Sequence, residues 1–147
     1  MLRVRCQASA TLDDKGRLML PGPIRREVER AGGALVFTFC RGALWGWSRA
    51  DFEAIEARAL PTDPLDVNGM AFAHAFLAPA QDVDMDAQGR IRIPPTLREL
   101  AGLERDIMVN GLLNRVELWD RARWEEHFKA SLDRLGALPG VPGWGGA

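Results

Sequence analysis

The hydrophobic and polar residues of this 147-residue chain follow a period that changes along its length. In Leu2–Ala8 apolar and polar residues alternate, and this period of two predicts a strand with one buried face. Asp13–Gly16 has the composition of a turn, and Arg17–Leu20 alternates again as the return strand. A helix over Pro23–Arg30 is expected next, because proline suits a first turn and Gly32 follows the end.

The following segment predicts a second pair of strands and another helix. Ala34–Phe39 and Ala43–Trp47 are short apolar runs of strand length. Ser48 stands directly before Arg49–Ala59 and is expected to cap that helix. The first half of the chain is therefore expected to read hairpin, helix, strand pair, helix.

A connecting helix and a second set of elements are predicted after this point. Asp63-Pro64 is expected to open a helix over Leu65–Leu77, whose nearly continuous apolar positions after Gly69 predict burial between the halves or against a partner. The second half is then expected to repeat the first: strands Gln81–Met85 and Arg90–Ile93, helix Pro95–Ala101, strands Ile107–Asn110 and Arg115–Trp119, and a helix capped by Asp120 that runs to Leu135.

The chain contains one motif twice. Asp13-Asp14-Lys15-Gly16-Arg17-Leu18-Met19-Leu20-Pro21 returns as Asp86-Ala87-Gln88-Gly89-Arg90-Ile91-Arg92-Ile93-Pro94, and Trp47-Ser48-Arg49-Ala50 returns as Trp119-Asp120-Arg121-Ala122. Each half has roughly 50 residues and would bury little surface alone. We therefore expect one shared core with a pseudo-two-fold axis and the two turns side by side.

Composition limits the function without deciding it. The net charge is −1, but residues 1–30 carry seven basic side chains against four acidic ones. Cys6 and Cys40 are isolated, which favours two small buried thiols over a metal site, and we expect no cofactor or metal. No apolar run is long enough for a membrane span and no signal sequence is seen at the start, so a cytoplasmic protein is expected.

The repeated motif, D-x-x-G-R followed by alternating apolar residues, proline and arginine, resembles the SpoVT/AbrB type of DNA-binding motif. Two copies, together with the G-x-x-N-R-x-E-x-W stretch at Gly111–Trp119, resemble the MraZ family over residues 1 to about 130. The resemblance implies a mainly β fold with appended helices, a double-split (swapped-hairpin) β-barrel of two pseudo-symmetric AbrB-like halves. The corresponding bounds are residues 7–53 and 79–125 for the halves, 54–78 for the connecting helices, and 126–147 for the helix end and a loose tail.

The resemblance also implies a function and partners. It predicts a sequence-specific, DNA-binding transcriptional regulator that acts on short repeats in duplex DNA upstream of its own division and cell wall gene cluster. A ring-shaped homo-oligomer associated with the nucleoid is implied as well, with no small-molecule substrate and no membrane partner.

Carried over by position, the DNA-facing residues are Lys15 and Arg17 in the first motif and Arg90 in the second. A long cation at such a turn reaches phosphate or a base edge, and arginine can pair with guanine through two hydrogen bonds. The alternative is that each arginine only pairs with the aspartate of its own turn, Asp13 or Asp86; both roles can hold together.

The remaining candidates have two interpretations each. Arg25 and Arg98 are predicted either to contact DNA or to form helix-surface salt bridges. Arg3, Arg5 and Arg92 are predicted to line the same DNA-facing side or to be a solvated strand face. Gly16 and Gly89, with Asp13 and Asp86, are expected to shape and orient the turns.

The second copy has Gln88 where the first has Lys15, so the second motif is expected to grip DNA less strongly and avidity within a ring would compensate. Two rival functions remain. An enzyme is disfavoured because no catalytic motif is present, and an antitoxin-like module is disfavoured because the segment after Leu135 is short and uncharged. Trp47 and Trp119 predict core packing rather than base stacking.

Overall fold

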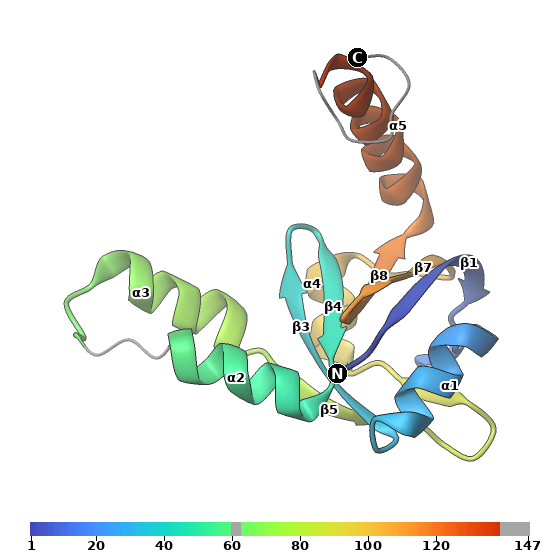
Figure 1. The fold of residues 1–147 in the computed structure, drawn as a ribbon, viewed down its shortest axis with the longest axis horizontal. Helices are drawn as coiled ribbons and strands as arrows, with labels where there is room; N and C mark the ends of the chain where they lie inside the picture. Colours follow the sequence, from blue (N-terminus) through green and yellow to red (C-terminus); the bar gives the residue numbers. More distant parts are fainter. Residues whose placement is uncertain (60–62, 139–147) are drawn as a thin grey trace.

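The computed structural model describes residues 1–59 and 63–138 (Figure 1). Its first strand has the alternation of more and less buried side chains that the sequence predicts. The first half consists of β1 (Val4–Thr11), β2 (Arg17–Met19), α1 (Gly22–Arg30), β3 (Ala34–Cys40), β4 (Ala43–Trp47) and α2 (Arg49–Ala59). After α3 (Val67–Phe72) and the π-helix η1 (Ala73–Leu77), the second half consists of β5 (Gln81–Asp84), β6 (Arg90–Arg92), α4 (Pro95–Ala101), β7 (Asp106–Leu113), β8 (Arg115–Asp120) and α5 (Arg121–Ala137).

The strands of the two halves are interleaved in a single antiparallel sheet. Its order is β1-β7-β8-β4-β3-β5, so the first strand of each half pairs with a strand of the other half. When each strand is replaced by its equivalent in the other half, the same order results, read from the opposite edge of the sheet. The expected pseudo-two-fold axis therefore passes between β4 and β8.

The residue register confirms the internal repeat. Thr11 pairs with Asp106 on one side of the sheet, and Asp84 pairs with Ala34 on the other. These are equivalent positions of the two halves. A separate two-stranded ribbon, β2–β6, has Leu18 opposite Ile91, which are also equivalent, so this pair lies on the same axis.

The main core lies between the sheet and the β2–β6 ribbon, and both halves contribute to it. Leu18 and Ile91 point inward from the ribbon, and Phe37, Val109 and Leu118 come from the sheet; all are buried. Apolar burial drives folding, and each half supplies only part of this core. The prediction of one shared core is confirmed.

The ladder does not close into a barrel within the described residues. β1 and β5 remain the edges of the six-stranded sheet, and only isolated bridges, Leu12 with Leu18 and Met85 with Ile91, connect the strands before and after each turn. The structure thus confirms a mainly β fold with helices, as an open sheet plus a ribbon.

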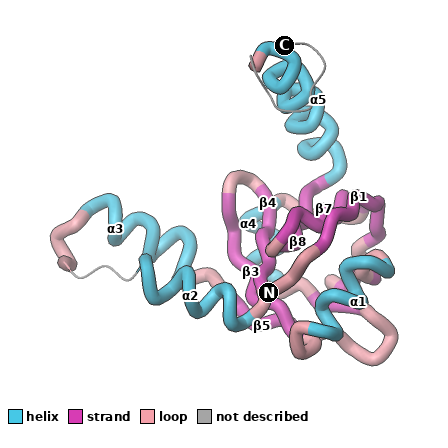
Figure 2. The backbone as a smooth tube through the Cα atoms, viewed as in Figure 1, coloured by secondary structure: helices cyan, strands magenta, loops and turns pink. Residues whose placement is uncertain are grey.

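The prediction for the connecting helix was wrong about its start and about burial between the two halves, while burial against a partner stays a prediction. The helix begins at Val67, because Asp66 and not Asp63 accepts the capping hydrogen bond, from the N–H of Gly69 at 3.1 Å. Neither α3 nor η1 has a buried residue, so the segment is not enclosed between the halves. It instead lies against α2, and the two helical segments extend together from the sheet (Figure 2).

α5 extends from the other end of the sheet and has no buried residue. Asp120 accepts from the N–H of Arg123, so the predicted cap is confirmed. Trp47 and Trp119 are buried at equivalent strand ends, as expected of core residues. Cys6 and Cys40 are half-buried free thiols, less enclosed than predicted, and burial raises the pKa of Cys40. The helix was predicted to end at Leu135 and the loose tail to begin at Gly136, but α5 continues through Ala137; residues 139–147 of the predicted tail lie outside the described residues.

Candidate nucleic-acid interface

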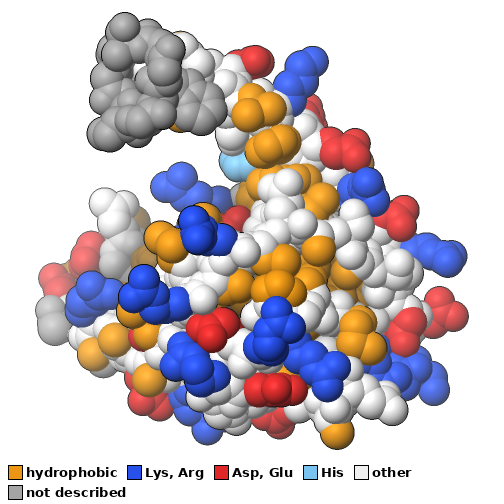
Figure 3. All heavy atoms as spheres, turned by 45° about the vertical axis from the view of Figure 1, so that its right-hand side comes forward, with side chains coloured by type: hydrophobic (Ala, Val, Ile, Leu, Met, Phe, Trp, Pro, Cys, Tyr) orange, Lys and Arg blue, Asp and Glu red, His pale blue; other side chains and the backbone are white. Residues whose placement is uncertain are grey.

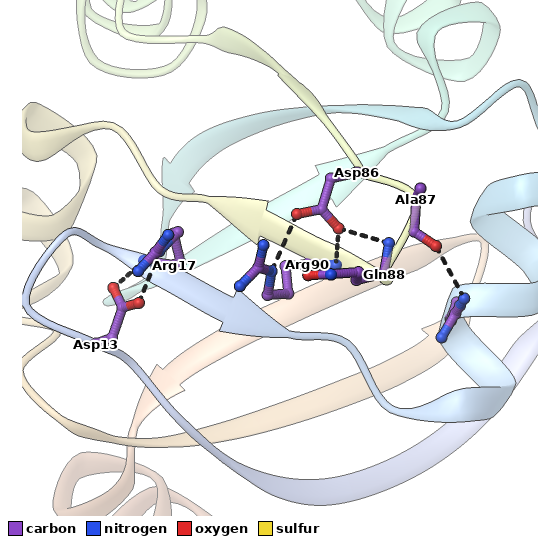
Figure 4. Close-up of polar contacts among 7 residues, drawn as sticks. Asp13, Arg17, Asp86, Ala87, Gln88 and Arg90 are labelled. Atoms are coloured by element: carbon purple, nitrogen blue, oxygen red, sulfur yellow. Dashed lines mark hydrogen bonds and ion pairs between the residues drawn. The ribbon is translucent and has the colours of Figure 1, made fainter.

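Each motif forms a tight turn organised by its aspartate (Figure 4). In the first motif, Oδ1 of Asp13 accepts from the backbone N–H groups of Lys15 and Arg17 at 2.9 and 2.8 Å. Its Oδ2 accepts from Nε of Arg17 at 2.8 Å. One carboxylate therefore fixes both the turn and the arginine that follows it.

The second motif repeats this geometry. Oδ1 of Asp86 accepts from the N–H groups of Gln88 and Arg90, both at 2.9 Å, and Oδ2 accepts from Nε of Arg90 at 3.0 Å. The backbone hydrogen bonds from Arg17 and Arg90 are the largest cause that lowers the pKa of Asp13 and of Asp86. Hydrogen bonding to the charged form explains the direction, and both carboxylates stay ionised near neutral pH.

Backbone hydrogen bonds at the two glycines connect each turn to the return strand of the other motif. The carbonyl of Gly16 accepts from the N–H of Ile93 at 2.8 Å, and the carbonyl of Gly89 accepts from the N–H of Leu20 at 3.0 Å. Both glycines have positive φ, +78° and +84°. These crossed hydrogen bonds extend the β2–β6 pairing at both ends, so the two motifs form one rigid ribbon.

Alternation along the ribbon divides its side chains between two faces. Leu18 and Ile91 enter the core, while Arg17, Met19 and the second-motif arginines Arg90 and Arg92 face outward. Arg17 stands opposite Arg92, and Met19 stands opposite Arg90. The outer face therefore carries three guanidinium groups around one half-exposed methionine.

The aspartates engage only one nitrogen of each arginine. The side chains of Arg17 and Arg90 are 40% and 35% exposed in their ion pairs. Only the Nε atoms take part in those pairs, and among the described residues no hydrogen bond uses the Nη atoms. The ion pair within each turn is therefore present, and it orients the tip of the arginine side chain; contact between that tip and DNA stays a prediction.

Arg25 and Arg98 lie behind the turns rather than on the ribbon face. Arg25 donates from Nη2 to the carbonyl of Ala87 at 3.3 Å and pairs with Glu29, so helix α1 supports the turn of the second motif. Arg98 of α4 packs against Gly16, where a Cβ atom would come within 2.9 Å of its Cζ. Each half thus supports the turn of the other half.

Arg3 and Arg5 are exposed but lie at the opposite end of β1 from the turn. The N–H of Arg3 donates to Glu27, and Arg5 is paired with Leu112 near the far end of β7. Arg92 joins Arg17 and Arg90 instead. Sequence reasoning did not single out Met19; the alternation of Leu18, Met19 and Leu20 was the signal that places it outward.

The chain matches the family model of the MraZ protein, whose description suggests an antitoxin-like character, over residues 7–65 and 76–135. It is 40% identical over 136 residues to the transcriptional regulator MraZ of Salinispora tropica, covering 88% of this chain and 94% of that protein. The chain belongs to the MraZ family.

Other MraZ relatives agree. The transcriptional regulator MraZ of a Parafrankia species is 41% identical over 138 residues, covering 88% of this chain and 93% of the relative. That of Lactobacillus delbrueckii subsp. bulgaricus is 35% identical over 117 residues, covering 79% of this chain and 80% of the relative. The two matched MraZ segments correspond to the two interleaved halves.

The name these relatives carry is that of a regulator and not of an enzyme, in agreement with the sequence analysis. None of the described helices is long and apolar enough to cross a membrane.

Proposed function

We propose that this protein is a cytoplasmic, nucleoid-associated transcriptional regulator that binds duplex DNA through the outer face of the β2–β6 ribbon. The observation that carries the proposal is the row of Arg17, Arg90 and Arg92 on that face, with Met19 between them. The major groove of B-DNA admits a two-stranded ribbon, and arginine can recognise guanine there through two hydrogen bonds.

The roles of the remaining candidates follow from their positions. Lys15 is exposed at the tip of the first turn and is assigned to a phosphate; Gln88, at the equivalent position, provides no charge. Arg25 and Arg98 position the turns. Arg3 and Arg5 are assigned at most to outlying phosphate contacts, because the length of β1 separates them from the ribbon.

The same symmetry supports the finer description of the fold. We infer that residues 7–53 and 79–125 are the two AbrB-like halves of a swapped-hairpin, double-split β-barrel in which the β2–β6 ribbon is the second layer. The palindromic strand order and the equal registers of the two halves support this inference.

We further propose a ring-shaped homo-oligomer. In the first half Phe52 is 3% exposed, and the ring of Phe76 from η1 stacks on it with the two ring centroids 6.0 Å apart. Its equivalent Trp124 begins an apolar stripe on α5 that continues through Phe128 and Leu132, which are 38% and 50% exposed. Figure 3 shows hydrophobic side chains continuing from this helix onto the body of the molecule. A second copy covering Phe128 and Leu132 would supply to α5 the apolar contact that η1 supplies to α2.

The stripe can be tested separately from DNA binding. Phe128→Ser with Leu132→Ser should lower the mass measured by sedimentation velocity, because these side chains are the apolar contact surface. Lys129→Ser on the same helix is the matched control and should leave the mass unchanged. An unchanged mass in the double variant would remove α5 from the interface.

The near-neutral charge fits weak binding by each protomer and avidity at repeats. Several protomers held in one assembly engage repeated DNA sites at a high effective concentration. We therefore propose short repeats upstream of the protein's own division and cell wall gene cluster as the target.

Fluorescence anisotropy with that upstream DNA and a scrambled duplex tests the function. Arg17→Ala and Arg90→Ala should each weaken specific binding about tenfold or more, since one good arginine–base contact contributes about 1–3 kcal/mol. Lys15→Ala should weaken binding to both duplexes and reduce the salt slope by about 1. Arg5→Ala is the matched control and should change the affinity less than Arg17→Ala. Equal affinity for the two duplexes, or unchanged affinity in both ribbon variants, would refute the assignment.

A further inference from the structure

A cleft with both polar and aromatic residues lies on the face of the sheet that points away from the β2–β6 ribbon. It measures about 380 Å³ and lies at the foot of α5. Its floor is a row of neighbouring strand residues, Asn110, Glu117 and Trp45, joined by the registers β7–β8 and β4–β8. These residues alternate with core residues such as Val109 and so point to the opposite face.

The floor contains a buried donor and a buried acceptor without partners. Asn110 is 7% exposed, and within the described part of the chain its Oδ1 has no hydrogen-bond partner. The same holds for the buried Nε1 of Trp45, which also lines the cleft. Leaving such groups unpaired is costly, and most buried polar atoms in proteins are satisfied. A donor and an acceptor left open in one cleft point to a ligand that provides the complementary groups.

The charges of the cleft favour an anion. Both oxygens of Glu117 already accept hydrogen bonds, from Nε of Arg115 at 2.8 Å and from Nε1 of Trp119 at 2.9 Å. The Cζ atom of Arg115 lies 4.0 Å from the centroid of the Trp45 ring, and Arg41 also lines the cleft. Two guanidinium groups against one fully used carboxylate leave an excess of positive charge.

Arg41 occupies its position at a conformational cost. It forms the β3–β4 turn with Gly42, and both have positive φ, +51° and +85°. Asparagine and glycine favour this turn, whereas a long side chain in the left-handed region is strained. The turn is fastened to α5, since Nη1 of Arg123 donates to the carbonyl of Gly42 at 2.9 Å. The strained residue is thus a cation held at the mouth of the cleft.

We propose that the cleft binds a small aromatic carboxylate that carries an N–H group. Arg41 and Arg115 would hold the carboxylate, and Nε1 of Trp45 would donate to it. Oδ1 of Asn110 would accept from the ligand N–H, and Trp124 and His127 of α5 would flank the ring. The volume lies at the small end of ligand pockets, which fits one such molecule rather than a nucleotide. This site goes beyond the proposed DNA binding and shares no residue with the ribbon.

Isothermal titration calorimetry with indole-3-carboxylate as the probe tests the proposal. The wild type should bind it, and both benzoate, which lacks the N–H, and neutral indole-3-carboxamide should bind at least tenfold more weakly. Arg41→Asn should weaken binding at least tenfold without loss of the fold, because asparagine suits the turn. Arg105→Asn, an exposed arginine outside the cleft, is the matched control and should bind as the wild type does.

Circular dichroism of Arg41→Asn and its anisotropy with DNA separate a lost site from a lost structure. Both should match the wild type while probe binding is reduced. No heat with millimolar probe, or equal affinity in Arg41→Asn, would overturn the proposal. Binding that appears only after dilution into monomers would assign the cleft to a second copy and would also overturn it.

Discussion

The glycines of the two turns allow backbone strain to be separated from close packing. A Cβ atom on Gly89 would lie 2.6 Å from Cδ, 2.9 Å from Nε and 3.1 Å from Cζ of Arg25. Gly33 has nearly the same φ, +83° against +84°, but nothing lies within 4 Å of its Cβ position. Replacing either glycine with alanine therefore imposes the same backbone strain, and only Gly89→Ala adds a steric conflict.

The expected magnitudes differ accordingly. A left-handed backbone costs an L-residue about 1–2 kcal/mol, which is the full expected cost of Gly33→Ala. Gly89→Ala should add about 1–2 kcal/mol, the lower part of the range for overpacking, because Arg25 can rotate away. That rotation also breaks the hydrogen bond from Arg25 to Ala87, which is included in this sum.

Urea unfolding at one fixed protein concentration measures these costs, and a double-mutant cycle isolates the conflict. The three nearest heavy atoms to the Gly89 Cβ position all belong to Arg25, so in the Arg25→Ala background the cost of Gly89→Ala should fall toward that of Gly33→Ala. Gly16→Ala should keep part of its cost in the Arg98→Ala background, because the carbonyl oxygen of Ile93 would remain 3.0 Å away. An equal cost of Gly89→Ala in both backgrounds would contradict a steric conflict with Arg25.

Two further predictions concern ion pairs. Hydrogen bonds from Arg30 and from the N–H of Arg3 lower the pKa of Glu27 from 4.5 to about 2, so the stability it contributes is present above pH 4.5 and is lost as the pH falls toward 2. The urea midpoint of the wild type should therefore drop more steeply over this range than that of Glu27→Gln; parallel curves would contradict it. Glu117→Ala should destabilise the fold by roughly 2–4 kcal/mol, because it leaves Arg115 and the buried Nε1 of Trp119 without their acceptor. Glu117→Gln keeps one acceptor oxygen and should cost less by thermal unfolding, and equal stabilities of Glu117→Ala and the wild type would contradict the role of the pair.

Much of the local structure was predictable because it depends on residues close in sequence. The turn at Asp13–Gly16 requires only an aspartate that accepts from N–H groups two and four residues later and a glycine with positive φ. Ser48 as a cap, with its hydroxyl accepting from the N–H of Asp51, and the bounds of α2 were read from the same local signals.

The connecting helix shows where such signals end. Its apolar residues indicated a buried helix, but periodicity does not specify which neighbour covers them. In the structure α2 is that neighbour on one side, and the segment has no buried residue. Arg25 and Arg98 were similarly ambiguous, because the turns that they support are far away in sequence.

The sequence by itself determined that the chain is a duplication, that each copy makes an Asp–Arg turn, and that the two copies differ at Lys15 and Gln88. Only the tertiary structure decided that the copies exchange strands and join their return strands into one ribbon with Arg17 opposite Arg92. It also brought Asn110, Glu117 and Trp45 side by side on the other face. The physical reason is range: turns and caps depend on bonds within a few residues, whereas strand partners are selected by burial of a core to which both halves contribute.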